Sequence, residues 1–233
     1  MKLTKIIAPL PLLVVAMAVI VVPNALADLV GATPTAPTAT VFPGNVTGDA
    51  PGTLLADLME PWTFTTTAGT TDGTLTTAVY KESGGTLDFY YQIANNANSV
   101  SAIARESNTD FASQAMNIST GFRTDGGSLA GSGFVNGTVP PVTADLNSAG
   151  SVVGFSFQPP DNAKIGPGMT SDVFLIVTDA TNYTSGNAEL LDGGSVTVSA
   201  FQPASTVPEP NFLIGIAMGL IAMVGVRRLR ART

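Results

Sequence analysis

The sequence contains no cysteine and no histidine among its 233 residues. Without cysteine the chain can form no disulfide, so a folded domain has to be stabilised by its core alone. Without histidine it lacks the usual general base and proton shuttle and the commonest metal ligand. Histidine- or cysteine-based zinc sites, Ser-His-Asp triads and Cys-His pairs are therefore excluded.

The first stretch of the chain is apolar and has the features of a targeting segment. Two lysines precede an apolar run over residues 6–22, and Ala25-Leu26-Ala27 follows with a small residue at each end. This order is typical of a secretory signal peptide, residues 1–27, which is cleaved after Ala27 so that Asp28 becomes the first residue. The alternative is an uncleaved N-terminal helix, which prolines within and beside the run disfavour.

A second apolar run, without a charged side chain, lies over residues 212–226. A helix over residues 212–229 is about 27 Å long at about 1.5 Å per residue, close to the ~30 Å hydrocarbon core of a bilayer. The run ends in Arg227, Arg228 and Arg230, and arginines beside a span stay on the cytoplasmic side. We therefore predict a transmembrane helix over 211–229 with a basic stop, a cytoplasmic tail 230–233, and the preceding residues outside the cytoplasm.

A short proline strip, Val207-Pro208-Glu209-Pro210, ends the linker 203–210 that precedes the apolar run. Proline lacks a backbone donor and disfavours helix in the residue before it, so the strip is expected to be extended. Extended backbone is the form that pairs along a protease cleft. The simpler alternative is a permanent single-span anchor with a proline-rich neck.

Pro208-Glu209-Pro210, the apolar run and the arginine cluster together resemble the PEP-CTERM sorting signal of Gram-negative bacteria, which is handled by the membrane-embedded processing enzyme exosortase. Residues 86–93 and 121–126 are similar to stretches of exported β domains that often carry this tail. The resemblance implies export, temporary membrane anchoring, processing near the Pro-Glu-Pro sequence, and release or surface attachment, commonly alongside exopolysaccharide.

The part between the two apolar ends is strongly acidic. Residues 28–207 contain sixteen acidic and four basic residues, a net charge of −12, whereas the whole chain carries −7. Binding of nucleic acid requires a basic patch, so we expect no nucleic-acid partner.

Strand patterns dominate this exported part. Residues 28–52 are a Thr-, Pro- and Ala-rich lead-in, and in residues 53–202 apolar and polar residues alternate over short runs such as 87–93. Residues 173–177 are continuously apolar, as in a strand covered on both sides, whereas the leucine-rich segment 54–59 fits either a short helix or a buried strand. Turn signals separate the runs, and together they predict one all-β domain over 53–202, an antiparallel β-sandwich of jelly-roll or Ig-like type.

Candidate sites in this domain are few. Tyr90, flanked by Asp88 and Gln92 on the polar face of its strand, is a candidate glycan contact, because a flat ring can stack on a sugar. The alternative is that Tyr90 packs under a loop or against the second sheet. No calcium-loop ligand spacing occurs, and we expect no metal site and no cofactor.

Clustered acids suggest one further chemistry. A pair drawn from Asp88, Glu106 and Asp110 could in principle hydrolyse a glycoside. Exposed acids are the default on an acidic domain, and Arg105-Glu106 is most simply a local ion pair or an exposed turn. We therefore expect a protein that is not an enzyme.

Two hypotheses for function remain. In the first, the secretion machinery and an exosortase-type enzyme deliver a non-catalytic structural protein to the cell surface or the extracellular matrix. In the second, the β domain is a carbohydrate-binding module that recognises extracellular polysaccharide.

Overall fold

The structure, a computed structural model, describes residues 28–29, 39–112 and 117–204. Among these residues there is no helix of the length and apolar character that a membrane crossing requires. The predicted transmembrane helix 211–229 lies outside the described residues, as do most of the predicted processing positions: Ala25, Ala27, Val207, Pro208, Glu209, Pro210, Arg227, Arg228 and Arg230.

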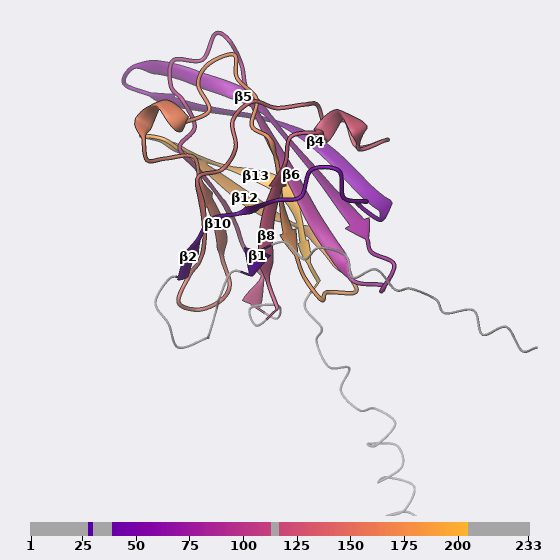
Figure 1. Cartoon of the computed structure of the whole chain (residues 1–233). Helices are drawn as coiled ribbons and strands as arrows, with labels where there is room; N and C mark the ends of the chain where they lie inside the picture. Colours follow the sequence, from indigo (N-terminus) through magenta and orange to yellow (C-terminus); the bar gives the residue numbers. More distant parts are fainter. Residues whose placement is uncertain (1–27, 30–38, 113–116, 205–233) are drawn as a thin grey trace, which may run out of the picture.

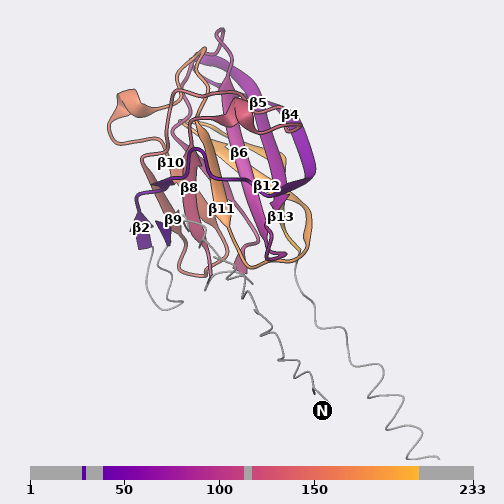
Figure 2. The same cartoon turned by 45° about the vertical axis from the view of Figure 1, so that its right-hand side comes forward.

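The described chain folds into two sheets packed face to face, with almost no helix (Figures 1 and 2). Sheet A has the order β1-β8-β11-β6-β5-β4, with β3 also on β8, and sheet B has the order β13-β12-β7-β10-β9-β2. The strands of sheet A are β1 (Asp28–Leu29), β3 (Gly44–Asn45), β4 (Thr53–Thr66), β5 (Gly69–Lys81), β6 (Leu87–Asn95), β8 (Ser119–Arg123) and β11 (Val173–Val177). Those of sheet B are β2 (Ala39–Val41), β7 (Arg105–Asn108), β9 (Thr143–Leu146), β10 (Val153–Ser156), β12 (Tyr183–Leu191) and β13 (Ser195–Pro203). The predicted all-β fold is confirmed.

The named strands pair antiparallel except for β3 and β8, which run parallel. The predicted lead-in is therefore part of the sandwich: β2 extends the edge of sheet B, and β3 then pairs at the edge of sheet A. Two single-turn 3-10 helices, Gly126–Ser128 and Asp161–Ala163, lie in connections.

The ambiguous leucine-rich segment is the first half of β4, so it is a strand rather than a helix, but it is not buried: Leu55 and Met59 are exposed. A register shift between Leu54 and Ala56 changes which side chains face inward. Leu54 packs outside the sandwich, whereas Trp62 and Phe64 farther along the strand lie in the core. β4 is an edge strand, and Pro61 is tolerated there because the edge requires no hydrogen bond from that position.

The core lies between the sheets and is rich in aromatic side chains. Phe89, Tyr91 and Ile93 of β6 face it in strict alternation, as the sequence predicts. Phe174 of β11 contacts Phe155 of β10 with ring centroids 4.7 Å apart, so one aromatic pair joins the two sheets. With no disulfide in the chain, this packing holds the layers together.

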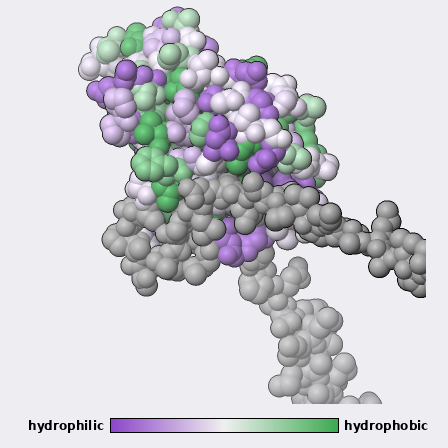
Figure 3. All heavy atoms as spheres, in the orientation of Figure 1, coloured by the Kyte–Doolittle hydropathy of each residue, from purple (hydrophilic) through white to green (hydrophobic). Residues whose placement is uncertain are grey.

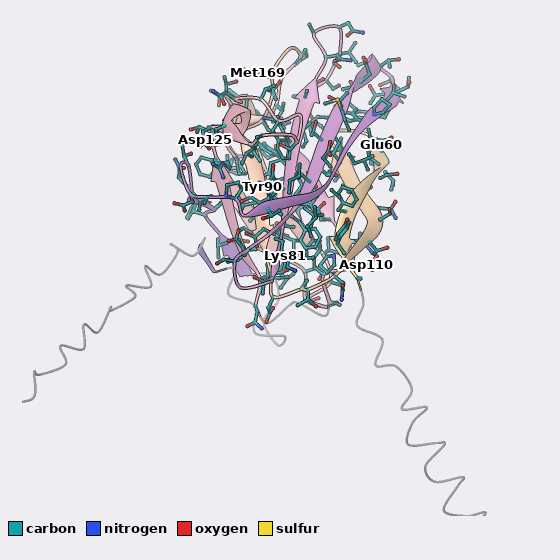
Figure 4. The ribbon with its side chains drawn as sticks, turned by 90° about the vertical axis from the view of Figure 1, so that its right-hand side faces the viewer. Glu60, Lys81, Tyr90, Asp110, Asp125 and Met169 are labelled. Atoms are coloured by element: carbon teal, nitrogen blue, oxygen red, sulfur yellow. The ribbon has the colours of Figure 1, made fainter. Side chains whose placement is uncertain are left out.

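Both ends of the described domain lie at one end of the sandwich, which we call the terminal pole. Leu29 pairs with Ser119, which in turn pairs with Val177 beside the start of β6. At the end of β13, Pro203 pairs with Tyr183 in the same region. The terminal pole thus contains Lys81 and Asp110, whereas Met169 lies at the opposite pole (Figure 4).

Replacing Phe174 by alanine is expected to remove about 3–5 kcal/mol from the free energy of unfolding, because the ring is fully buried and its loss leaves a cavity. The same substitution at Phe42, whose side chain is 74% exposed, should change it by no more than about 0.5 kcal/mol. Urea denaturation of both variants tests this, and equal effects would contradict the position of the core.

Candidate functional site

The candidate glycan contacts share one face of β6, as their alternation predicts, but that face is not exposed. Asp88, Tyr90 and Gln92 are 5%, 3% and 3% exposed. The connection from β8 to β9, residues 124–142, packs on Tyr90 and hydrogen-bonds to Gln92, and we call it the cap. The interpretation of these three residues as an exposed glycan surface is therefore wrong, and the alternative, that Tyr90 packs under a loop, is correct.

A second apolar cluster, separate from the main core, fills the space beneath the cap. Leu129 and Phe134 of the cap pack there with Tyr80 and Tyr90 of sheet A. The Tyr90 ring lies 4.7 Å from that of Tyr80 and 6.5 Å from that of Phe134, measured between centroids. The central strands of sheet A are consequently buried on both faces, which explains why β11 is a continuous apolar run.

Gln92 binds the cap to the sheet through its side-chain amide. Its Nε2 donates to the carbonyl oxygens of Val135 and Ser171, at 2.7 and 2.9 Å. Its Oε1 accepts from the amide of Val135 at 3.0 Å. Both polar atoms of this buried amide are therefore used in holding backbone, that of the cap at Val135 and that of Ser171, just before β11.

Arg123 and Asp125 form the second attachment of the cap. The Arg123 guanidinium, with a side chain only 2% exposed, donates Nε and one terminal nitrogen to the two oxygens of Asp125 at 2.7 and 2.9 Å. Its other terminal nitrogen donates to the carbonyl of Asp49, and the amide of Gly48 donates to Asp125. Hydrogen bonding by Arg123 lowers the pKa of Asp125 to about 2. This network joins the lead-in, β8 and the cap.

Asp88 lies at the end of this face that is nearest the terminal pole, beside Glu82. Burial, and after it the neighbouring Glu82, raise the pKa of Asp88 to about 8. The same burial raises the pKa of the adjacent Tyr90 hydroxyl. A carboxyl group in this setting holds a proton at neutral pH rather than a negative charge.

The structure does not bring together the three acids considered for glycoside hydrolysis. Asp88 lies beside Glu82 on the outer face of sheet A, Glu106 faces the core from β7 of sheet B, and Asp110 follows β7 at the terminal pole. The predicted exposure of Glu106 and its pairing with Arg105 are both wrong. Arg105 points to the other face of the sheet and binds Asp145, with N–O distances of 2.6 and 2.8 Å.

Sequence reasoning missed this Arg105–Asp145 pair on the outer face of sheet B. Arg105 and Asp145 lie on either side of β10, and the guanidinium crosses Gly154, where a Cβ would lie 1.9 Å from its nitrogen. Only the register of three strands reveals the pair, because forty residues separate its members. The glycine within the otherwise regular strand was the one available signal.

Within the described part of the chain, no three or more acidic, histidine or cysteine side chains lie close enough together to hold a metal ion. On the side of the molecule seen in Figure 3, polar and apolar residues are interspersed over the coloured surface.

Comparison with known protein families, with curated proteins and with solved structures found no match to this chain. A proposal for function consequently depends on the residues of this chain and on their arrangement.

Replacing Gln92 by methionine, which keeps its length but removes its polar atoms, should lower the free energy of unfolding by about 2–4 kcal/mol, because three buried hydrogen bonds are lost. Hydrogen exchange of the Val135 amide should become faster. Gln158→Met, in a half-buried position just after β10 of sheet B, is the matched control. Unchanged exchange in Gln92→Met would show that the cap does not depend on this side chain.

The Arg123–Asp125 pair should make the fold sensitive to acid. Because the folded state lowers the pKa of Asp125 from 3.8 to about 2, the stabilisation is present above about pH 4 and disappears as the pH falls through about 2. Asp125→Asn should lower the free energy of unfolding at pH 7 by about 1–3 kcal/mol and remove this part of the acid dependence.

The matched control is Asp161→Asn, because Asp161 pairs with Lys164 through a side chain that is 90% exposed. Such a pair contributes little, so this variant should behave as wild type at both pH values. Urea unfolding at pH 7 and in acid decides the matter. If Asp125→Asn lost as much stability in acid as the wild type does, the assignment of this acid dependence to Asp125 would be contradicted.

Proposed function

We propose that this chain is an exported protein that is anchored transiently in the inner membrane and processed at a PEP-CTERM-type signal by an exosortase-type enzyme. In this proposal a signal helix over residues 1–27 and a membrane helix over residues 211–229 flank the sandwich. The sandwich itself has a non-catalytic, structural role at the cell envelope or in the extracellular matrix, in association with exopolysaccharide.

One observation carries the proposal. Within residues 207–230 the sequence has a proline strip, an apolar run without charge, and an arginine cluster, in that order. A plain membrane anchor needs the run and the arginines but has no need of two prolines around a glutamate. The strip suits a segment presented to a membrane-embedded protease, because its prolines hold it extended.

The geometry of the sandwich supports attachment at one end. The described domain begins and ends at the terminal pole, so both flanking segments leave from the same side. After Pro203 only four residues precede Pro208, and they span about 14 Å at most at about 3.5 Å per residue. In the anchored form the terminal pole therefore faces the membrane and the opposite pole faces away from it.

The placement of the charged side chains supports a structural rather than a catalytic role. Asp88 is buried beside Glu82, Glu106 is buried in the core, and Arg123 and Asp125 hold the cap in place. The same burial removes the reason for proposing carbohydrate binding through Asp88, Tyr90 and Gln92.

Mass spectrometry of the protein from the membrane and from the medium should identify both of its termini. We expect Asp28 as the first residue in both fractions and, in the medium, a last residue between Pro208 and Pro210. A variant with Pro208→Ala, Glu209→Ala and Pro210→Ala should stay full-length in the membrane fraction. Its matched control is Pro203→Ala, outside the strip, which should be processed as wild type. Recovery of only uncut C-termini from wild-type cells would overturn the proposal.

A further inference from the structure

Glu106 is a carboxyl group in the middle of the core, and neither the fold nor the proposed function has yet given it a role. It lies on β7, the third strand of sheet B, and is 0% exposed. Its neighbours across the two adjacent strands are Phe155 and Leu190, which are also fully buried. An ionised carboxylate without a positive partner is strongly disfavoured in such an environment.

Asn108, two residues along the same strand, lies on the same side of the sheet and is 1% exposed. Its Nδ2 donates to Oε2 of Glu106 at 2.8 Å. The other oxygen of each group, Oε1 of Glu106 and Oδ1 of Asn108, is buried and accepts no hydrogen bond from the described residues. Two groups that are already joined at one end therefore each have one unsatisfied acceptor.

We infer that Glu106 carries a proton in the native fold and forms a closed acid–amide pair with Asn108. The proton on Oε1 is donated to Oδ1 of Asn108, while Nδ2 of Asn108 donates to Oε2. One proton taken up from solvent thus satisfies both unsatisfied oxygens and removes the buried charge. Glu106 is in this way a proton-binding site inside the sandwich, and the proton is a structural component of the fold.

The charged and titratable groups around Glu106 fit this assignment. Arg105 is its neighbour on β7 but points to the opposite face and is bound to Asp145. From sheet A, Tyr91 of β6 is the titratable side chain that faces Glu106. Its hydroxyl donates to the carbonyl of Phe201 at 2.9 Å, so its proton is already used. Burial raises the pKa of Glu106 to about 8, although the Asn108 bond and, more weakly, Arg105 act in the opposite direction.

Because the bound proton is lost as the pH rises, the sandwich becomes less stable towards alkaline pH. Between the ordinary pKa of 4.5 and about 8, the folded state keeps a proton at Glu106 that the unfolded state has lost. The folding equilibrium constant therefore falls up to tenfold per pH unit as the pH rises through this window. Below it both states are protonated, and the effect vanishes.

Glu106→Gln tests the inference, because a glutamine amide can donate to Oδ1 and accept from Nδ2 without any proton from solvent. The test is urea unfolding of the full-length protein in detergent from pH 5 to pH 8. Unfolding is followed by the fluorescence of Trp62, the one tryptophan in the chain. The folding equilibrium constant of the variant should fall less steeply with rising pH than that of the wild type, with a difference of up to tenfold per pH unit. Equal slopes would overturn the inference.

Asp88 is the matched control, since it is a second buried carboxyl group whose pKa is raised to about 8, in this case beside Glu82. Asp88→Asn should remove its own part of the slope, and adding Glu106→Gln to that background should remove a further part. If the double variant matches Asp88→Asn alone, the proton is not at Glu106.

A direct measurement remains informative even if Glu106→Gln does not fold. The chain contains five glutamates, so the carboxyl carbons of isotope-labelled glutamate can be followed individually by NMR. In the Asp88→Asn background, one glutamate should stay protonated at pH 7 and titrate near pH 8. A spectrum in which all five are ionised at pH 7 would overturn the assignment.

Discussion

Burial of both faces of sheet A is the constraint on which the rest of this structure depends. The inner face packs on sheet B, and the outer face packs on the cap and the lead-in. The central strands β6 and β11 have no solvent-facing row, so a polar side chain there is removed from water and is stabilised by a partner within the protein. Because the chain has no disulfide, these contacts and the apolar packing beside them are what stabilise the layers.

This constraint explains how the domain uses its few positive charges. Arg123 lies almost fully buried between the cap, the lead-in and sheet A, and Arg105 lies across the outer face of sheet B. Each is bound by two oxygens of one aspartate, an arrangement that fixes geometry as well as charge. In a domain with a net charge of −12 these arginines serve the fold, and the excess of acidic residues remains available to keep the surface soluble.

Two of the buried carboxyl groups, Asp88 and Glu106, represent different solutions to the same problem. Asp88 lies against a second acid near the terminal pole, whereas Glu106 has an amide partner in the core. Neither carboxyl group has a cation as its partner, and the pKa of each is raised to about 8. Because each would lose its proton at alkaline pH, the fold is better suited to neutral or mildly acidic surroundings. For a protein proposed to be exported, this property would be felt outside the cytoplasm, where pH is less closely controlled.

The sequence alone determined the all-β fold, the alternating faces of β6 and the doubly covered character of β11, because these follow from a local period of two side chains. It also located the segments proposed to direct export and processing, since charge order and apolar length can be read along the chain. The tertiary structure alone decided which face was exposed. The local pattern placed Tyr90 and Gln92 on a polar face, whereas in the fold the cap, some forty residues away in sequence, covers them. It likewise decided that Arg105 pairs with Asp145 and not with the adjacent Glu106. The physical reason is that burial and strand register are set by contacts distant in sequence, which a local pattern does not contain.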